Sequence, residues 1–256
     1  MPLAPLPVRI VGILIVAFLV APIFIVIPMS FNGSRFLAFP PPELSLRWYA
    51  EFFSDPQWIR AAMRSLWVAT IVAVASTIIG AGAAALVDRA PLVVRSVAYV
   101  VFAAPIILPV IVYAVGIYST FSYLRIIGSD LGLIIAHTMI AMPFPFLTVT
   151  AAYAQYDRTL DKAAGSSGAS PWRTYTQITI PQIRPAIVAG ALFAFLSSFD
   201  EVVIAMFLSG ARSTLPKLMF DDMRFGLSPV IAAIATLLIV LTSVGLLVVL
   251  RRQRRP

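Results

Sequence analysis

The sequence predicts an all-α, polytopic membrane protein with six transmembrane helices. Of its 256 residues, 60% are hydrophobic and 12% are charged, whereas an ordinary soluble domain is about 45–50% apolar and about 25% charged. One core of this size cannot bury so much apolar surface, which excludes a soluble globular enzyme. The same numbers exclude a disordered chain, because disordered segments are highly charged and poor in apolar residues.

Six apolar segments predict the membrane spans. A span needs about 20 apolar residues. Five uncharged runs meet this length: Ile10–Phe31, Ser65–Val87, Ser96–Leu124, Leu131–Tyr156 and Phe225–Leu250. A sixth run, Pro185–Phe199, continues as Val202–Ala211 after the acid pair Asp200 and Glu201. We expect this segment to be one helix with two acids inside it.

The first span is expected to remain in the protein as an anchor. Its apolar run is longer than the h-region of a secretory signal, and Met29-Ser30-Phe31 is not a small-x-small cleavage site. After it, Pro40–Pro42 and then Trp48 predict an extended stretch followed by a short amphipathic helix at the membrane interface, with an irregular loop as an equal alternative.

Proline and small residues predict how the spans bend and pack. Pro105 and Pro109 should bend the third span, and Pro143 and Pro145 should bend the fourth. Gly80 and Ala84 in the second span form a small-xxx-small face that allows close helix packing.

The distribution of positive charge predicts the orientation. Six spans place both termini on one side. The tail that follows the last span holds four arginines within Arg251–Arg255, and such a cluster is typical of the cytoplasmic side. With the tail inside, inner segments carry 11 Lys and Arg and outer segments carry 8. We therefore expect both termini in the cytoplasm.

The sequence lacks the common catalytic patterns. It has no Cys and one His, His137, so no metal site is expected. It has neither His-Glu-x-x-His nor Gly-x-Ser-x-Gly, so no catalytic residues are expected. It also lacks Gly-x4-Gly-Lys-Ser/Thr, which indicates that the chain does not hydrolyse ATP itself and needs no cofactor of its own. An intramembrane hydrolase using His137 is a weak alternative, because a lone His at a span end is usually packed.

The segment Asp157–Arg184 carries the most information. It predicts a helix, a turn and a second helix, because Ser170-Pro171 is an N-cap followed by a proline at the first helical position. Pro181 and Pro185 are expected to end this second helix before the next span. Ala164 and Gly168 are four residues apart and are expected on one helical face, where small side chains leave room for a partner surface to approach closely. Two hypotheses follow: this segment docks a partner protein, or it only connects two spans.

This segment resembles the EAA loop of permease subunits of binding-protein-dependent ABC importers. That pattern is Glu-Ala-Ala, three residues, Gly, nine residues, Ile, one residue and Leu-Pro, and the spacing here is intact. The matching positions are Lys162, Ala163, Ala164, Gly168, Ile178 and Pro181. The departure is Lys162, where the family usually has Glu, with Asp161 just before it.

A second segment indicates which group of these permeases the chain resembles. Leu196–Ile204, with Ser209-Gly210 and Leu215-Pro216 beyond it, is similar to the fifth span of spermidine/putrescine-type permeases, and among them to the second of the two paired subunits. The resemblance implies the type I importer fold, a paired homologous permease, two ATP-binding subunits that hold ATP and magnesium, and an extracytoplasmic substrate-binding protein. It implies a bacterial inner membrane location and no nucleic acid partner.

The resemblance also divides the chain. Residues 1–59 are expected to form an N-terminal helix and an extracytoplasmic segment. Residues 60–250 are expected to form the transport domain, with the EAA loop at 160–181, and residues 251–256 a basic tail.

Asp200 and Glu201 are the candidate substrate path. A charge at the bilayer centre costs about 2.5–3.5 kcal/mol on insertion scales, so these acids should face a cavity or a partner group. Acids in the path suit a polycation, which favours polyamines as the cargo, although a structural ion pair is an equal alternative. The rivals are an importer of the same group for iron, thiamine or a phosphonate, and, less well supported, an autonomous channel or secondary transporter.

Overall fold

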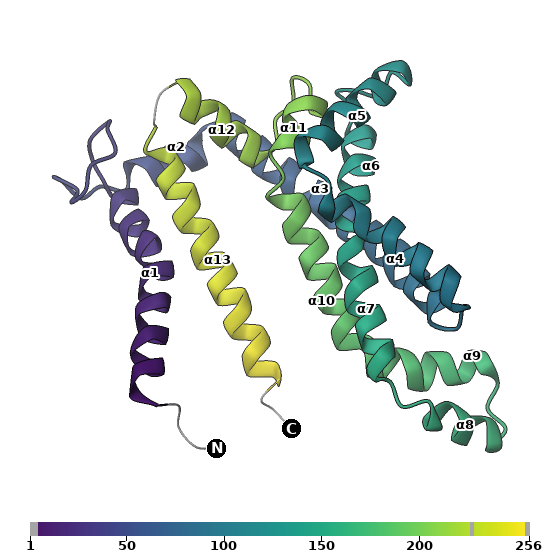
Figure 1. Ribbon diagram of the computed structural model, residues 1–256. Helices are drawn as coiled ribbons and strands as arrows, with labels where there is room; N and C mark the ends of the chain where they lie inside the picture. The colour runs from purple at the N-terminus through teal and green to yellow at the C-terminus, as the bar shows by residue number, and fades with distance from the viewer. Residues whose placement is uncertain (1–4, 226–227, 254–256) are drawn as a thin grey trace. The chain divides into compact units, whose positions relative to one another are not determined.

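The computed structural model describes residues 5–225 and 228–253, and the elements in these ranges are helices (Figure 1). The chain divides into two compact units. The first comprises the two ends, up to Arg60 and from Met219, and the second comprises Ala61–Leu218. The all-α class predicted from composition is confirmed.

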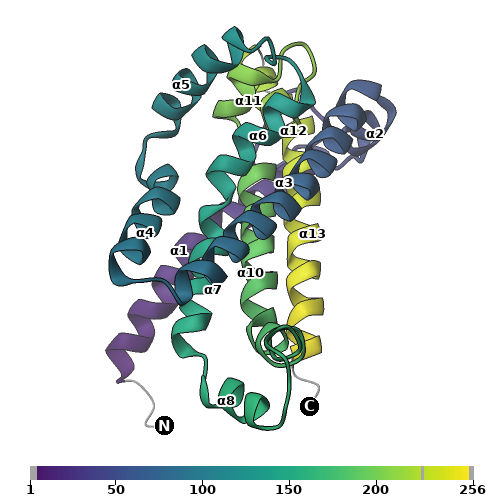
Figure 2. The same ribbon diagram turned by 90° about the vertical axis from the view of Figure 1, so that its right-hand side faces the viewer.

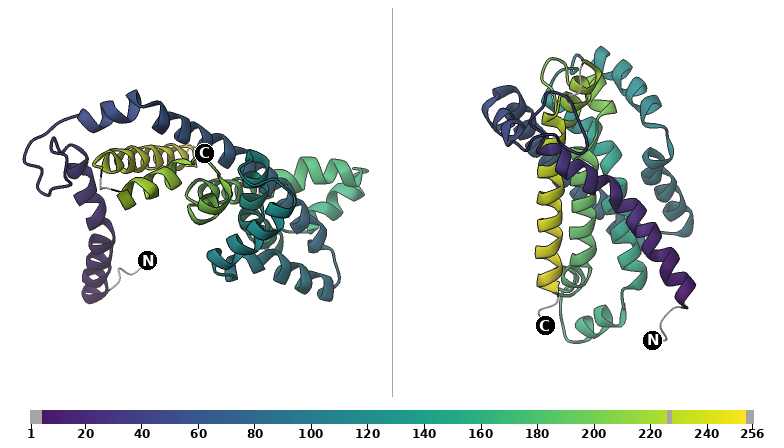
Figure 3. Two further views of the ribbon diagram at one scale, coloured as in Figure 1. Left: turned by 90° about the horizontal axis from the view of Figure 1, so that it is seen from above. Right: turned by 90° about the vertical axis from the view of Figure 1, so that its left-hand side faces the viewer.

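The described part of the first unit contains three complete helices. Helix α1 (Leu6–Ser30) contacts helix α13 (Val230–Gln253), and the two run in roughly opposite directions while diverging toward the start of α1 (Figures 1 and 3). Helix α13 also packs on the short helix α2 (Arg47–Ser54). The predicted short amphipathic helix is therefore present. Its Trp48 is buried and donates an indole hydrogen bond of 2.6 Å to the carbonyl of Asn32, which holds α2 against the end of α1.

The second unit contains the remaining elements. They are α3 (Pro56–Asp88), α4 (Leu92–Ile107), α5 (Val110–Tyr123), α6 (Asp130–Ala141), α7 (Pro143–Gln155), α8 (Thr159–Ser166), α9 (Pro171–Thr174), the π-helical turn η1 (Tyr175–Thr179), α10 (Ile180–Phe199), α11 (Val203–Leu208) and α12 (Leu215–Phe225), the first and last of which continue into the other unit. Helices α8 and α9 lie at one end of this unit, and α11 lies at the other (Figure 2).

The predicted span positions match helices, but the count of six is not reproduced. By length and composition, four helices of the described part can cross a membrane: α1, α3, α6 with α7, and α9 through α10. The pair α4 and α5 makes a fifth if a bend of 101° is allowed within one span. The last predicted span falls on α13, of which Val230–Val244 forms a shorter apolar stretch in the described residues.

Proline accounts for the bend between α4 and α5. Pro105 lies inside α4, and Pro109 precedes the first residue of α5. Because proline donates no amide hydrogen and clashes with the preceding turn, the helix cannot continue smoothly through this stretch. The predicted bend in this span is confirmed. In the next span, α6 and α7 meet at Met142 and still form one candidate span.

The predicted small-residue face on α3 is used for close packing. A Cβ added at Gly80 would lie 2.7 Å from the carbonyl oxygen of Met142 and 2.9 Å from the ring of Pro145. On the other side, a Cβ at Gly190 of α10 would lie 2.6 Å from the Cα of Pro145. Two glycines on two helices thus allow α3 and α10 to approach the junction of α6 and α7 backbone to backbone. Ala84, one turn after Gly80, is fully buried.

Two predictions about the tenth helix were wrong. Pro181 and Pro185 do not end the helix of the loop: the chain is helical from Pro171 to Phe199, over 29 residues. The π-turn η1 directly precedes Pro181, and such a turn relieves the clash between a proline ring and the preceding turn. Pro181 therefore occupies the first turn of α10, where its missing amide hydrogen costs little.

The acid pair does not lie inside a helix. Helix α10 ends at Phe199, Asp200 is its C-cap, and α11 begins only at Val203. Carboxylates inside an apolar helix would lack hydrogen-bond partners. A break between two helices leaves free backbone amides from which a carboxylate can accept hydrogen bonds. The predicted single helix over Pro185–Ala211 is thus two helices with the acids at the break.

Candidate functional site

The loop after α7 forms the helix–turn–helix that its sequence predicts. The hydroxyl of Ser170 accepts a hydrogen bond of 3.3 Å from the amide of Arg173, which caps α9 with Pro171 at its first position. Gly168 has a φ of +82°, a left-handed conformation that glycine adopts without strain. This residue therefore makes the turn between α8 and α9.

One face of this loop is open. Lys162, Ala163 and Gly168 are exposed, and a Cβ added at Gly165 or Gly168 would meet nothing within 4 Å. The indole of Trp172, just beyond the turn, is 73% exposed. Tryptophan is enriched at protein–protein interfaces. The open space at the small residues and the exposed indole together favour docking over a mere connection.

The structure separates the remaining predicted loop residues from this face. Ala164 is half-buried on α8, whereas Gly168 lies in the turn beyond the end of that helix, so the prediction that these two residues share one helical face was wrong. Ile178 lies half-buried in η1, and Pro181 lies in the first turn of α10. The second group therefore joins the loop to the next span, while Lys162, Ala163 and Gly168 remain at the surface.

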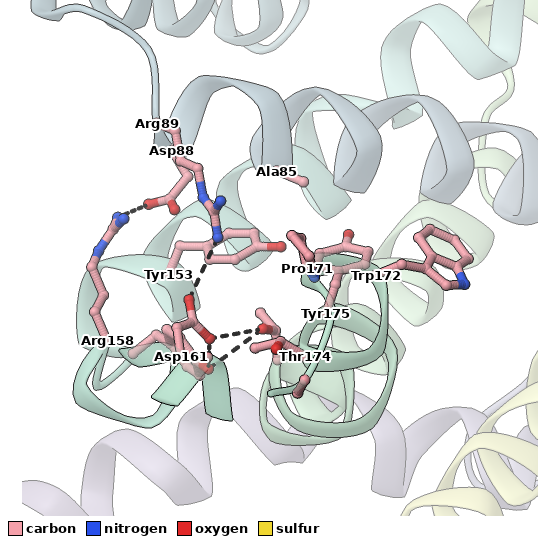
Figure 4. A pocket seen from close by; sticks show the side chains of 14 residues that line it. Ala85, Asp88, Arg89, Tyr153, Arg158, Asp161, Pro171, Trp172, Thr174 and Tyr175 are labelled. Atoms are coloured by element: carbon pink, nitrogen blue, oxygen red, sulfur yellow. Dashed lines mark hydrogen bonds and ion pairs between the residues drawn. The ribbon is translucent and has the colours of Figure 1, made fainter. Parts of the chain in front are cut away.

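A group of polar side chains attaches α8 to the ends of α3 and α7 and to η1. The carboxylate of Asp161 accepts a hydrogen bond of 2.6 Å from the hydroxyl of Tyr156 and one of 3.4 Å from that of Thr179. Its other oxygen lies 3.5 Å from the guanidinium of Arg89, which follows the last residue of α3. Figure 4 shows Arg89 and Asp161 facing each other, with Tyr153 nearby. Sequence reasoning noted Asp161 only as a neighbour of Lys162.

A second ion pair lies beside the first. Arg158 contacts the carboxylate of Asp88 at 2.6 Å, and the Asp88 side chain is 10% exposed. The neighbouring carboxylate of Asp157 accepts a hydrogen bond of 2.9 Å from the backbone amide of Thr159, and this bond lowers the pKa of the Asp157 carboxyl from its usual value. Asp157 thus remains ionised while taking no part in either ion pair.

These groups line a cavity of about 490 Å³ between the end of α3, the end of α7 and the loop. Its wall includes Tyr153, Tyr175 and Trp172, together with both ion pairs (Figure 4). Because each acid here already has a basic partner, the cavity carries no uncompensated charge for an ionic ligand. Its polar lining instead connects the loop to the membrane helices.

The two acids of the predicted substrate path have different surroundings. Asp200 is exposed, and its backbone amide donates to the carbonyl of Leu196. Glu201 is partly buried, and its carboxylate accepts a hydrogen bond of 3.0 Å from the amide of Ile204, in the first turn of α11. Glu201 therefore caps the start of α11, whereas the side chain of Asp200 is exposed.

His137 is a packed residue. It is fully buried on α6, and its Nδ1 lies 3.0 Å from the hydroxyl of Ser198 on α10. This contact joins two spans, as expected of a lone packed histidine. Among the described residues, no three His, Cys, Asp or Glu side chains come together as a metal site would require.

An ion network near α11 escaped the sequence reasoning. Asp130, the first residue of α6, contacts Arg64 of α3 at 2.8 Å and Arg212, which follows α11, at 3.0 Å. Arg64 is almost buried, with 8% of its side chain exposed. The three charges lie far apart in the sequence, so no local pattern indicates that they meet.

Comparison with known proteins assigns the family. Residues 76–255 match the model of the binding-protein-dependent transport system inner membrane component. The chain belongs to this family. It is an inner membrane permease subunit of an ABC importer, which confirms the prediction made from the EAA spacing, and such a subunit is a transport component and not an enzyme.

Two relatives of this importer permease transport polyamines. This chain is 34% identical to the putrescine transport system permease protein PotI of Escherichia coli K12, over 93% of this chain and 88% of the relative. It is 31% identical to the spermidine/putrescine transport system permease protein PotC of the same organism, over 90% and 87% of the two chains.

A solved structure shares the fold of this permease. A chain of a bacterial ABC transporter that imports the acidic polysaccharide alginate superposes with a TM-score of 0.71 and 17% identity, over 98% of this chain and 99% of that one. The type I importer permease fold predicted from the sequence is confirmed.

Proposed function

We propose that this permease subunit moves polyamines, or similarly small organic cations, into the cell. Its relatives PotI and PotC are polyamine permeases at 31–34% identity over most of their length. An exposed carboxylate, Asp200, stands at the end of α10, where it can attract an ammonium group. Anionic cargo would be repelled at this position, which argues against a phosphonate.

The proposed energy source is a pair of separate ATP-binding subunits that dock on α8 and the turn after it. The observation that carries this proposal is the open face of Lys162, Ala163 and Gly168 beside the exposed Trp172. The loop is joined to Asp200 by one helical segment of 29 residues. At about 1.5 Å per residue this segment is roughly 43 Å long, so a push on the loop can reach the far end of α10 through a stiff element.

The remaining parts of the proposed complex follow from the family. A second, homologous permease subunit covers exposed apolar surface, and an extracytoplasmic binding protein delivers the cargo. Both termini and the loop at 160–181 lie in the cytoplasm in this arrangement, as the arginine distribution favours. ATP and magnesium bind to the partner subunits and not to this chain.

Co-purification of the ATP-binding subunit with a loop variant tests the docking. A tryptophan at Gly168 would also strain the left-handed turn, so Ala163→Trp is the cleaner change, since Ala163 is exposed in a regular helix. We expect Ala163→Trp to insert normally and to lose the ATP-binding subunit. Leu92→Trp, at an exposed residue of α4 outside the loop, is the control and should retain it. Full recovery of the subunit with Ala163→Trp would refute docking at this face.

A further inference from the structure

Helix α8 has little apolar attachment to the rest of its unit. None of its residues is buried, and a side chain at Gly165 would meet only open space. Apolar burial normally holds a helix in place, because a short isolated helix is unstable in water. Some other interaction must therefore fix the position of α8 relative to the membrane helices.

Polar contacts supply this attachment. Asp161 binds Tyr156 at the end of α7, Thr179 in η1 and Arg89 at the end of α3, at 2.6, 3.4 and 3.5 Å. The Arg158–Asp88 pair adds a second connection to the end of α3 at 2.6 Å. We call these six side chains the polar clamp. It connects the start of the loop to three separate membrane elements.

The clamp and the open face use different sides of the same helix. Asp161 and Lys162 are adjacent, and adjacent residues point about 100° apart on an α-helix. The Asp161 side chain is 22% exposed and turned toward the unit, whereas Lys162 is exposed. Asp161 therefore attaches α8 to its unit, and Lys162 remains available to a partner protein.

We propose that Asp161 is a positioning residue that transmits movement of the docked loop to the ends of α3, α7 and α10. This inference rests on the proposed function, because it assumes that a partner moves α8. A rigid connection of the loop to α10 alone would move one helix. The clamp makes α3 and α7 follow as well, so that the spans reorient together.

The test separates docking from transmission. Asp161→Asn removes the charge that holds Arg89 while keeping nearly the same shape. Asp157→Asn is the matched control: it removes the same charge from the same loop, but Asp157 bonds only to the amide of Thr159. Each variant is assembled with its partner subunits in proteoliposomes. Co-purified ATP-binding subunit, ATP hydrolysis and cargo taken up per ATP hydrolysed are then measured.

For Asp161→Asn we expect normal recovery of the ATP-binding subunit, continued ATP hydrolysis, and uptake per ATP lowered by up to about fivefold, the size expected for loss of a partly exposed ion pair. Asp157→Asn should match the wild type in all three. Loss of the ATP-binding subunit from Asp161→Asn would overturn the inference, because Asp161 would then belong to docking. Uptake per ATP equal to that of the control would overturn it too. If even the wild type recovers no ATP-binding subunit, the proposed function itself fails.

A charge swap keeps the inference testable should Asp161→Asn assemble poorly. Arg89→Asp and Asp161→Arg alone place like charges together at the contact between these two residues and should lower uptake per ATP. The double variant restores an ion pair of opposite polarity between the same positions and should recover part of the loss. A double variant no better than either single one would overturn the inference, because the contact between Asp161 and Arg89 would then not transmit movement.

Discussion

At the scale of single residues, Asp200 and Glu201 separate into two roles. Glu201 accepts the amide of Ile204 and stabilises the start of α11, whereas Asp200 is exposed at the end of α10. The sequence presents them as one acid pair, and only the break between the two helices distinguishes them. Asp200 is therefore the residue on which the proposed cation path depends.

Removal of the Asp200 charge should impair transport without impairing assembly. Asp200→Asn keeps the shape of the side chain, and its backbone contact to Leu196 is unaffected. We expect complex yield and basal ATP hydrolysis to stay normal, while cation uptake per complex falls by about tenfold, as for one lost hydrogen bond to a charged group. Unchanged uptake would remove Asp200 from the path.

Variants of Glu201 should show the opposite pattern. Glu201→Ala removes the acceptor for the amide of Ile204, and loss of a helix N-terminal acceptor costs about 0.5–2 kcal/mol. The expected result is a lower thermal unfolding midpoint and a lower yield in detergent. Glu201→Gln retains a carbonyl acceptor and should behave nearly as the wild type in both measurements. A large loss of uptake in Glu201→Gln at normal yield would instead place this residue in the cation path.

At the scale of elements, close packing at the junction of α6 and α7 organises the second unit. Gly80 of α3 and Gly190 of α10 both reach Pro145 from helices on either side of it. The cluster around Phe146 extends this contact, with Phe102 of α4 stacked on it at 4.5 Å between ring centroids. The helices α3, α4 and α10 therefore all pack at this junction of α6 and α7.

A methyl group at Gly80 should be poorly tolerated. The added Cβ would lie 2.7 Å from the carbonyl oxygen of Met142, and neither backbone can move freely. Overpacking of this kind costs about 1–3 kcal/mol. Gly82→Ala in the same helix meets nothing within 4 Å and should be neutral or stabilising by up to about 1 kcal/mol. Thermal unfolding in detergent compares the two, and equal midpoints would contradict the packing described for α3.

The sequence predicts where the helices lie better than it predicts the residues at which they begin and end. Runs of apolar residues mark the spans because the bilayer demands length and hydrophobicity. The proline rule failed at Pro181, because the π-turn at Tyr175–Thr179 absorbs the clash, and no local pattern announces such a turn. The loop residues were found from spacing, whereas Asp161 was not assigned a role, since its partners Arg89 and Thr179 meet it only in the folded chain.

At the scale of the whole molecule, the orientation of the chain in the membrane is the first expectation to test. A reporter fused after Arg255 should report the cytoplasm, and one inserted near Pro41 should report the outside, because the arginines cluster at the end of the chain. These positions can be assayed in living cells with a pair of compartment-specific reporters. The reverse pattern would place the loop at 160–181 outside, where no ATP-binding subunit could reach it.

The family and its partners give the molecule its overall role. The EAA spacing predicts an importer permease, and the match over residues 76–255 confirms it. The cargo is less accessible to sequence reasoning, because a separate binding protein delivers it. Only Asp200 and the polyamine relatives point to a cation.

The most direct test of the account is cargo uptake by the complete complex in proteoliposomes. The chain is assembled with its paired permease, ATP-binding subunits and binding protein, and uptake of labelled putrescine and spermidine is measured with and without ATP. The account predicts ATP-dependent uptake of at least one polyamine, dependence on the binding protein, and loss of uptake in Ala163→Trp. Uptake that persists without ATP or the binding protein, or ATP-driven uptake of thiamine, iron or a phosphonate with no polyamine transport, would contradict it.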